Sequence, residues 1–270
     1  MPLRDGRASR FSGGMRLAIV SAAPSRTTLA LAATCVRDVE IVPMTPAVAA
    51  SSLGPGDAVL GRLDVRQTLD GIDDGLWALG VLAARGVTVL NGPATLIATH
   101  DKLVTARLLR RMGLPHPCTR HLRRGRPLED LHAPVVVKPR HGSWGRNVVV
   151  CETDDELTAV LEALGREAAP GEWRTNVALG AGRVPVTPSP TAVLLALSAA
   201  RSTSAALVGV DLLPTPDGGY TILEVNGAVD FTRAYRPDAD IFRETVTELG
   251  RFAREARDEK ARSSADPLPV

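Results

Sequence analysis

Short apolar runs alternate with stretches of helical periodicity over the first third of the chain. The runs typical of strands cover residues 17–22, 40–45, 58–64 and 87–91, and the helical periodicity covers 25–33 and 69–85. Such alternation implies a parallel sheet whose faces are covered by helices. A further helix is predicted over 100–112, because Gly113 can end it and two prolines follow closely. Trp77, in the second of the earlier helices, is expected in the core.

The order of elements changes after residue 114. The pattern predicts strands at 134–139, 147–151, 207–213 and 220–226, and helices at 154–164, 191–202 and 238–257. Thr153 is the expected N-cap of the first of these helices. The two later strands are predicted to form a hairpin, and no internal repeat is present. The chain therefore combines an α/β region with an α+β region.

Length and composition exclude several classes of protein. A chain of 270 residues with 44% hydrophobic and 23% charged residues has the proportions of a globular protein of one or two domains. No apolar run approaches the ~18 residues of a membrane span, and a net charge of +2 predicts no nucleic-acid or membrane partner. Three widely separated cysteines exclude a cysteine zinc site and favour a cytoplasmic protein. Residues 1–14 and 259–270 are expected to be flexible tails.

Lysine is rare in this chain. Of the 32 basic residues, only Lys102, Lys138 and Lys260 are lysines, and the others are arginines. An ammonium is a compact point charge that suits a phosphate oxygen, and a planar guanidinium is not its equivalent. Each lysine is therefore a candidate for a specific role.

The predicted hairpin near the end of the chain carries the strongest chemical signal. If its turn is centred near Asp217, Asp211 lies opposite Glu224, with side chains roughly 5 Å apart. Asn226 is two residues beyond Glu224 and projects from the same face. Two carboxylates and an amide oxygen suit Mg²⁺, which completes its shell with water and substrate phosphates. The alternative is that the carboxylates face solvent and pair with arginines, but the flanking residues are too apolar for an open face.

A glycine loop follows Lys138, which ends an apolar run. The loop contains Gly142, Ser143, Trp144 and Gly145. Glycines let backbone N–H groups approach an anion, so the loop could cover nucleotide phosphates, with the tryptophan shielding a bound group. Taken alone, the loop is better explained as an ordinary hairpin connection beside an exposed lysine. Together with the acidic hairpin, the phosphate interpretation is favoured.

Two weaker signals accompany these. Lys102 lies in the first turn of a predicted helix, where a lysine is unfavourable for the helix dipole unless an anion lies nearby. Arg174 and Asn176 share one side of an extended segment and can reach a transferred phosphoryl group. Lys102 alone is equally well explained as a solvated residue, and the second signal is weak by itself.

Several common motifs are missing from the sequence. The chain has no GxxxxGK[ST], no GxGxxG after a strand, no GxSxG and no HExxH. The sequence therefore lacks the main evidence for four enzyme classes: P-loop nucleotidases, nicotinamide enzymes, serine hydrolases and zincins.

The segments HDKL, VVVKPRHGSWGRNV, EWRTN and GVDLL with ILEVN, in this order, resemble the RimK-like group of ATP-grasp carboxylate–amine ligases. GSWGR and EVNGAVDF are most similar to the LysX-type branch. The resemblance covers residues 15–257. It implies a pre-ATP-grasp domain at 15–92 and an ATP-grasp domain at 93–258. Two subdomains of the latter, 114–165 and 171–258, would hold ATP between them.

The resemblance also implies a role for each candidate residue. Lys102 and Lys138 match the nucleotide-binding lysines, and residues 142–145 match the phosphate-covering loop. The set of matched Mg²⁺ ligands is Asp211, Glu224 and Asn226. Arg174 and Asn176 match contacts to the phosphate and the acyl phosphate, and Arg62 resembles a substrate-facing arginine.

The family chemistry that the resemblance implies is amide formation. ATP phosphorylates a carboxylate, and an amine then attacks the acyl phosphate. The implied cofactors are ATP and Mg²⁺, with Mn²⁺ as an alternative cation, and the implied amine substrate is an amino acid. In the LysX-type branch the carboxylate is the C-terminal glutamate of an acidic carrier protein, which places the reaction in amino-acid biosynthesis. The oligomeric state is left open, a homo-oligomer included.

One segment departs from the family pattern. Between the helix at 154–164 and EWRTN, relatives have about two further strands, which include the acidic segment beside adenine. In this chain the helix is followed almost directly by EWRTN. The alternative to a ligase is therefore a degenerate, non-catalytic ATP-grasp-like protein that binds a nucleotide or a partner. A small-molecule kinase is a third interpretation, since phosphoryl transfer alone would use the same acidic face.

Overall fold

The N-terminal half is built on a four-stranded parallel sheet. Its strand order is β2–β1–β3–β6. The strands are β1 (Met15–Val20), β2 (Val39–Met44), β3 (Ala58–Gly61) and β6 (Thr88–Leu90), and they confirm the four apolar runs predicted as strands. The structure is a computed structural model that describes residues 14–65, 67–68, 71–72, 74–121, 131–141, 148–162 and 184–265.

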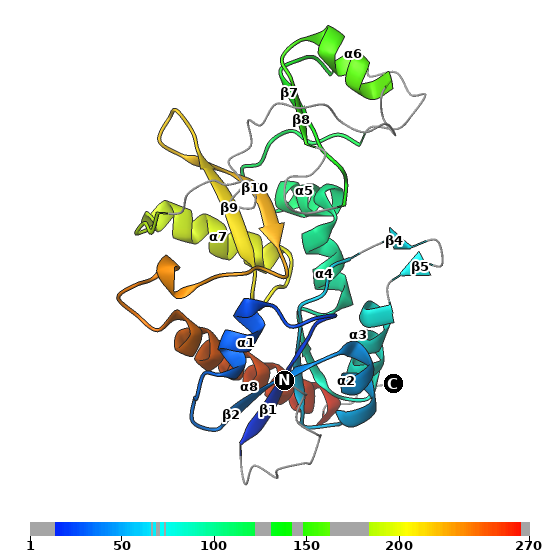
Figure 1. The fold of residues 1–270 in the computed structure, drawn as a ribbon, viewed down its shortest axis with the longest axis vertical. Coiled ribbons are helices and arrows are strands. Elements are labelled where there is room, and N and C mark those ends of the chain that lie inside the picture. The colour runs from blue at the N-terminus through cyan, green and yellow to red at the C-terminus, as the bar shows by residue number, and fades with distance from the viewer. Residues whose placement is uncertain are drawn as a thin grey trace.

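Helices cover both faces of this sheet (Figure 1). One face packs against α2 (Pro46–Ser52), α3 (Asp74–Ala84) and α4 (Pro93–His100), and the other against α1 (Arg26–Ala32) and α8 (Ile241–Ala265). Successive side chains of a strand point to opposite faces, so Leu17 of β1 lies in the α8 cluster and Ala18 in the α3 cluster. No helix among the described residues is both long enough and apolar enough to cross a membrane.

The C-terminal helix therefore returns to the N-terminal sheet. Phe242, Val246 and Leu249 of α8 are buried in the cluster on this face, where α8 packs against strands β2 and β6. The sequence assigns this helix to the second predicted domain, but its apolar face completes the core of the first. The two halves of the chain are consequently joined by packing as well as by the connecting segments.

The middle of the molecule is an antiparallel hairpin of β9 (Gly209–Pro214) and β10 (Tyr220–Asn226). Helices α4, α5 (Lys102–Arg111) and α7 (Pro190–Ser202) pack on it (Figure 1). Ile222 and Val225 of β10 are buried in one cluster with Leu109 of α5 and Ala199 of α7. The hairpin confirms the sequence prediction, and α7 corresponds to the helix predicted at 191–202.

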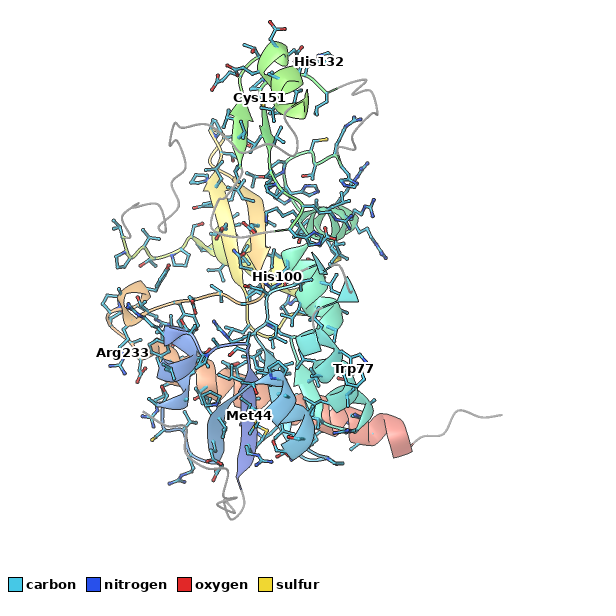
Figure 2. All side chains as sticks on the ribbon, turned by 45° about the vertical axis from the view of Figure 1, so that its right-hand side comes forward. Met44, Trp77, His100, His132, Cys151 and Arg233 are labelled. Carbon is cyan, nitrogen blue, oxygen red and sulfur yellow. The ribbon has the colours of Figure 1, made fainter. Side chains whose placement is uncertain are left out.

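A small lobe lies at the end of the molecule remote from the parallel sheet. It consists of β7 (Val135–Val137), β8 (Val149–Cys151) and α6 (Asp154–Glu162), and its two strands pair antiparallel. His132 and Cys151 mark this lobe at the top of Figure 2. Thr153 caps α6 as predicted, because its Oγ1 accepts a hydrogen bond from the Glu156 N–H at 3.2 Å.

Several element boundaries differ from the sequence prediction. The helix expected over 69–85 begins at Asp74, because short strands β4 (Gln67–Thr68) and β5 (Gly71–Ile72) pair before it. The helix expected over 100–112 is divided at Asp101 into α4 and α5. The last helix begins at Ile241 and continues to Ala265, beyond the point where a tail was expected. Helix α2 and a 3-10 turn, η2 (Arg233–Tyr235), were not predicted.

The prediction that Trp77 lies in the core is wrong. Its side chain is 71% exposed on the outer side of α3 (Figure 2). Leu76, Leu79 and Leu82 form the buried stripe of this helix at intervals of three residues. Trp77 lies one position away from that stripe and therefore points outward.

The close approach of β3 to the loop after β6 generates a stability prediction. A methyl group added at Gly61 would overlap the carbonyl oxygen of Asn91 and come within 2.8 Å of a Leu79 methyl carbon. Gly61→Ala should therefore lower the free energy of unfolding by about 1–3 kcal/mol, measured by urea denaturation. Gly80→Ala is the matched control, because nothing lies within 4 Å of its added methyl and alanine favours a helix by about 1 kcal/mol. A Gly61→Ala protein as stable as Gly80→Ala would contradict this packing.

Candidate active site

The register of the β9–β10 hairpin places two carboxylates opposite each other. Asp211 pairs with Glu224, as the sequence predicts, and Asn226 pairs with Gly209. Asn226 follows Glu224 by two residues and therefore shares its face. The three side chains that were predicted to bind a metal thus come from one face of the hairpin.

A bulge in β10 separates this acidic face from the core. Ile222 pairs with Leu212, but the next pair is Glu224 with Asp211, so Leu223 is an extra residue. The bulge turns both Ile222 and Val225 toward the buried cluster and leaves Glu224 on the opposite face. Strict alternation would have put Ile222 and Glu224 on the same face. The local irregularity therefore aims the glutamate.

Lys102 is held beside this face by the start of α5. Asp101 is the N-cap of that helix, and its carboxylate accepts hydrogen bonds from the backbone N–H groups of Leu103 and Val104 at 3.0 and 3.2 Å. The Lys102 ammonium lies 3.3 Å from Oε1 of Glu224. The lysine that is unfavourable for its own helix dipole therefore has an anionic partner in Glu224.

Lys138 approaches the same glutamate from the lobe. It directly follows β7, so that strand fixes where its side chain begins. Burial lowers the pKa of Lys138, the charge of Glu224 raises it, and the charge of Lys102 lowers it further. The two ammonium groups and one carboxylate therefore interact directly through their charges.

A small pocket of about 30 Å³ lies between α5, β10 and the lobe. Lys102, Lys138 and Glu224 line it together, with Leu109 and Ile222 as apolar walls. The pocket is the place where the lysines of two separate elements and the acidic hairpin meet. The charges of these groups, rather than the volume of the pocket, suit a ligand that carries both phosphate and a divalent cation.

The charge distribution on the hairpin also favours a cation. Burial and the negative charge of Glu224 both raise the pKa of Asp211, although one side of that residue remains open to solvent. Among the described residues no group of three His, Cys, Asp or Glu side chains forms a metal cluster. Two carboxylates and an amide oxygen nevertheless match Mg²⁺, which uses one or two carboxylates and takes its other ligands from water and phosphate.

Arg62 lies away from this pocket, at the carboxyl ends of strands β1 and β3. Its backbone N–H donates to the Val20 carbonyl at 2.9 Å, and its Nη2 donates to Oδ1 of Asp230 at 3.0 Å. The side chain is 4% exposed, and the buried Nη1 has no hydrogen-bond partner among the described residues. Burial lowers the pKa of Arg62, and the charge of Asp230 opposes this.

The remaining predicted residues cannot be placed. Gly142, Ser143, Trp144 and Gly145 lie outside the described residues, as do Arg174 and Asn176. Their roles therefore stay predictions.

Sequence reasoning missed two charged residues beside the pocket. Asp101 and Arg140 form an ion pair in which Nε lies 2.9 Å from both carboxylate oxygens. An aspartate directly before a helical pattern is a known N-cap signal, and it would have moved the predicted helix start from 100 to 102. Arg140 has no comparable signal, because its partner is distant in the sequence.

The fold and the site together define an ATP-grasp protein, and comparison with known sequences identifies its family. The sequence profile of the RimK-like ATP-grasp domain matches residues 99–169 and 160–241. These ranges contain both lysines and the acidic hairpin. The chain belongs to the RimK-like ATP-grasp family, and the prediction of an ATP-grasp enzyme of the carboxylate–amine ligase type is confirmed at that level.

Individual relatives have ligase names. The Probable alpha-L-glutamate ligase 2 of Shewanella frigidimarina is 28% identical over 233 residues, which cover 72% of this chain and 76% of that protein. The Alpha-aminoadipate–LysW ligase LysX of Saccharolobus solfataricus is 29% identical over 191 residues, which cover 56% and 70%.

Solved structures agree on the fold. The D-alanine–D-alanine ligase of Bacillus anthracis complexed with ATP has a TM-score of 0.63 at 18% identity, covering 92% of this chain and 99% of its own. The RimK domain ATP-grasp protein of Sphaerobacter thermophilus has a TM-score of 0.57 at 20% identity, covering 88% and 99%. The predicted ATP-grasp fold with an N-terminal parallel-sheet domain is therefore confirmed.

The raised pKa of Asp211 predicts that this residue opposes stability. Because its pKa is higher in the folded protein, ionisation favours unfolding, and its unfavourable effect grows as the pH rises above the unfolded value of about 3.9. Asp211→Asn should therefore raise the melting temperature of the metal-free protein at pH 7. The gain should disappear below about pH 3.9, where both proteins are neutral at this position.

Asp217 in the turn of the same hairpin is the matched control. Hydrogen bonds from the Thr215 side chain and the Gly219 backbone lower its pKa. Asp217→Asn should therefore lower the melting temperature at pH 7, and this loss should fade as the pH falls. Equal signs for the two variants would contradict the electrostatic difference between them.

Proposed function

We propose that the protein is an ATP- and Mg²⁺-dependent ligase that joins a carboxylate to the amine of an amino acid. The observation that carries this proposal is the convergence of Lys102 and Lys138 on Glu224, which itself faces Asp211 across the hairpin. The names of the relatives, a glutamate ligase and an aminoadipate–LysW ligase, support amide formation.

In this proposal Asp211, Glu224 and Asn226 would hold the Mg²⁺, which would supply positive charge to the phosphate oxygens and offset the repulsion between the two carboxylates. Lys102, now bound to Glu224 at 3.3 Å, and Lys138 turn their ammonium groups to the triphosphate. By the resemblance to the family, residues 142–145 would cover the phosphates, and Arg174 and Asn176 would contact the transferred phosphoryl group.

The reaction has two balanced steps. An oxygen of the substrate carboxylate attacks the γ-phosphorus, the bond to the β-phosphate oxygen breaks, and ADP leaves. The amine then attacks the acyl carbon, inorganic phosphate leaves, and the amine loses a proton. The cationic residues act by electrostatic stabilisation, because the phosphoryl group gains charge on its oxygens during transfer.

Arg62 is the candidate contact for a substrate carboxylate. Its Nη2 is occupied by Asp230, whereas the buried Nη1 has no partner among the described residues. A buried polar atom without a hydrogen bond is costly, and a carboxylate oxygen would satisfy it. Arg62 also lies outside the carboxyl ends of parallel strands, which is where α/β folds bind ligands.

The C-terminal glutamate of an acidic carrier protein is our proposed acceptor carboxylate. The similarity to a ligase named for LysW supports it. A free amino acid or a short peptide ending in glutamate is the competing acceptor, and assays with each acceptor separate the two.

A non-catalytic nucleotide-binding protein is the second candidate function. The two matches to the family profile overlap at residues 160–169, next to the segment where the resemblance leads us to expect further strands. Isothermal titration separates the candidates: Mg·ATP binding without turnover in any combination of amino acid and acceptor favours the second one.

The lysines provide the direct test. Lys102→Met and Lys138→Met should each lower kcat/KM about 100-fold in an assay of ADP release that requires Mg²⁺, an amino acid and an acceptor carboxylate. Lys260→Met is the control, because this exposed lysine of α8 does not line the pocket and is distant in the sequence from the residues that do. A wild-type protein that folds normally but releases no ADP with any acceptor would overturn the ligase proposal. Equal activity of all three variants would remove the assigned role of the two lysines.

A further inference from the structure

The two lysines of the pocket belong to separate parts of the molecule. Lys138 belongs to the lobe, whose elements β7, β8 and α6 pack mainly against one another, and Lys102 belongs to α5 beside the hairpin (Figure 1). Glu224 attracts both ammonium groups, and at Lys138 its attraction outweighs the repulsion by Lys102. This shared attraction has no preferred direction, so it does not by itself fix the position of the lobe relative to α5 before a polyanion binds.

One buried carboxylate lies at the junction of the lobe and α5. The side chain of Asp101 is 4% exposed, and Arg140, two residues after Lys138, donates to it from Nε at 2.9 Å to each oxygen. Nη2 of the same arginine also contacts Asp101, and Nε2 of His141 lies 3.5 Å from it. Arg140 thus binds with a fork geometry, which fixes direction as well as distance.

The same junction contains a backbone hydrogen bond. The Lys102 N–H donates to the Arg140 carbonyl oxygen at 3.0 Å, one residue after the capping aspartate. Asp101 therefore fixes the first turn of α5, and so Lys102, while its other contacts fix the segment that leads away from Lys138. Burial alone would raise the pKa of Asp101, but the hydrogen bonds from Arg140 and Val104 and the positive charges outweigh it, so the pKa is lowered.

We infer that Asp101 and Arg140 are positioning residues that set the spacing of Lys102 and Lys138 before Mg·ATP binds. This inference depends on the proposed function, since it assigns the triphosphate to the two lysines. Neither residue needs to touch the nucleotide. Their contribution to affinity comes from preorganisation, because the lobe does not have to be ordered by the ligand.

The test uses variants that separate the ion pair from the helix cap. Asp101→Asn retains a side chain that caps helices as well as aspartate does, but it removes the charge. Arg140→Ala removes the partner, but the Asp101 carboxylate still accepts hydrogen bonds from the N–H groups of Leu103 and Val104, so this variant is expected to fold. Isothermal titration of the full chain with Mg·ATP, without amino acid or acceptor, should show about 10-fold weaker binding for each variant.

Three further measurements distinguish positioning from a general structural role. The KM for ATP should rise about 10-fold in both variants while the KM for the amino acid changes less than about twofold. The double variant should bind about as weakly as either single variant, because both changes remove one interaction. Arg140→Lys should restore part of the affinity, since an ammonium can reach one carboxylate oxygen but lacks the fork.

Asp57→Asn is the matched control. Asp57 forms an equivalent two-bond pair with Arg16, at 3.1 and 2.8 Å, at the amino-terminal ends of the central strands β1 and β3 and outside the lining of the pocket. The Asp57→Asn variant should have a lower melting temperature and should bind Mg·ATP within about twofold of wild type.

The outcomes are distinct. If the wild type binds Mg·ATP and both Asp101→Asn and Arg140→Ala bind it equally well, the positioning role is wrong while the proposed function stands. Losses that add in the double variant, or that appear equally in the KM for the amino acid, also overturn it. If the wild type itself binds no Mg·ATP, the proposed function fails, and this inference fails with it.

Discussion

The site depends on two carboxylates that are held opposite each other on neighbouring strands. Burial raises the pKa of Asp211, and repulsion by the Glu224 carboxylate raises it further. Such a pair persists only because the rest of the structure determines the register of the hairpin. Ile222 and Val225 on the reverse face supply that constraint, since a one-residue slip would remove them from the core.

The base of the hairpin is fixed by a single side chain from the N-terminal half. Nδ2 of Asn91 donates to the Leu207 carbonyl at 2.7 Å and to the Gly227 carbonyl at 3.3 Å, and its Oδ1 accepts from the Ala206 N–H at 2.8 Å. The residue is 2% exposed and has a φ of 47°, which asparagine tolerates better than most side chains. The parallel sheet and the acidic hairpin are thus tied together where β6 ends. Their relative position is part of the site, although Asn91 lies outside the pocket.

Sequence reasoning succeeded where one local rule decided the outcome. The Asp211–Glu224 pairing followed from the turn position, and the strands followed from their apolar runs. It failed where two rules competed: apolar periodicity continued through Asp101, and the capping signal of that residue was overlooked. It also could not find Arg140 and Asp230, because each acts through a partner that only the fold brings near. The docking of α8 on the first sheet is equally non-local.

The choice of lysine over arginine in the pocket follows from the same charge problem. A guanidinium beside Glu224 would form a planar, two-bond pair with that carboxylate and would compete with a cation for both oxygens. The Lys102 ammonium contacts Oε1 of Glu224 at 3.3 Å as a point charge without a planar fork, so it can turn to a phosphate oxygen. By contrast, the residue that must stay paired with Asp101 is an arginine, Arg140, whose guanidinium contacts both carboxylate oxygens. All but three of the 32 basic residues of this chain are arginines. Lysine is used in the pocket, where the cation must be able to change partners, and arginine is used opposite Asp101, where the pair must stay fixed.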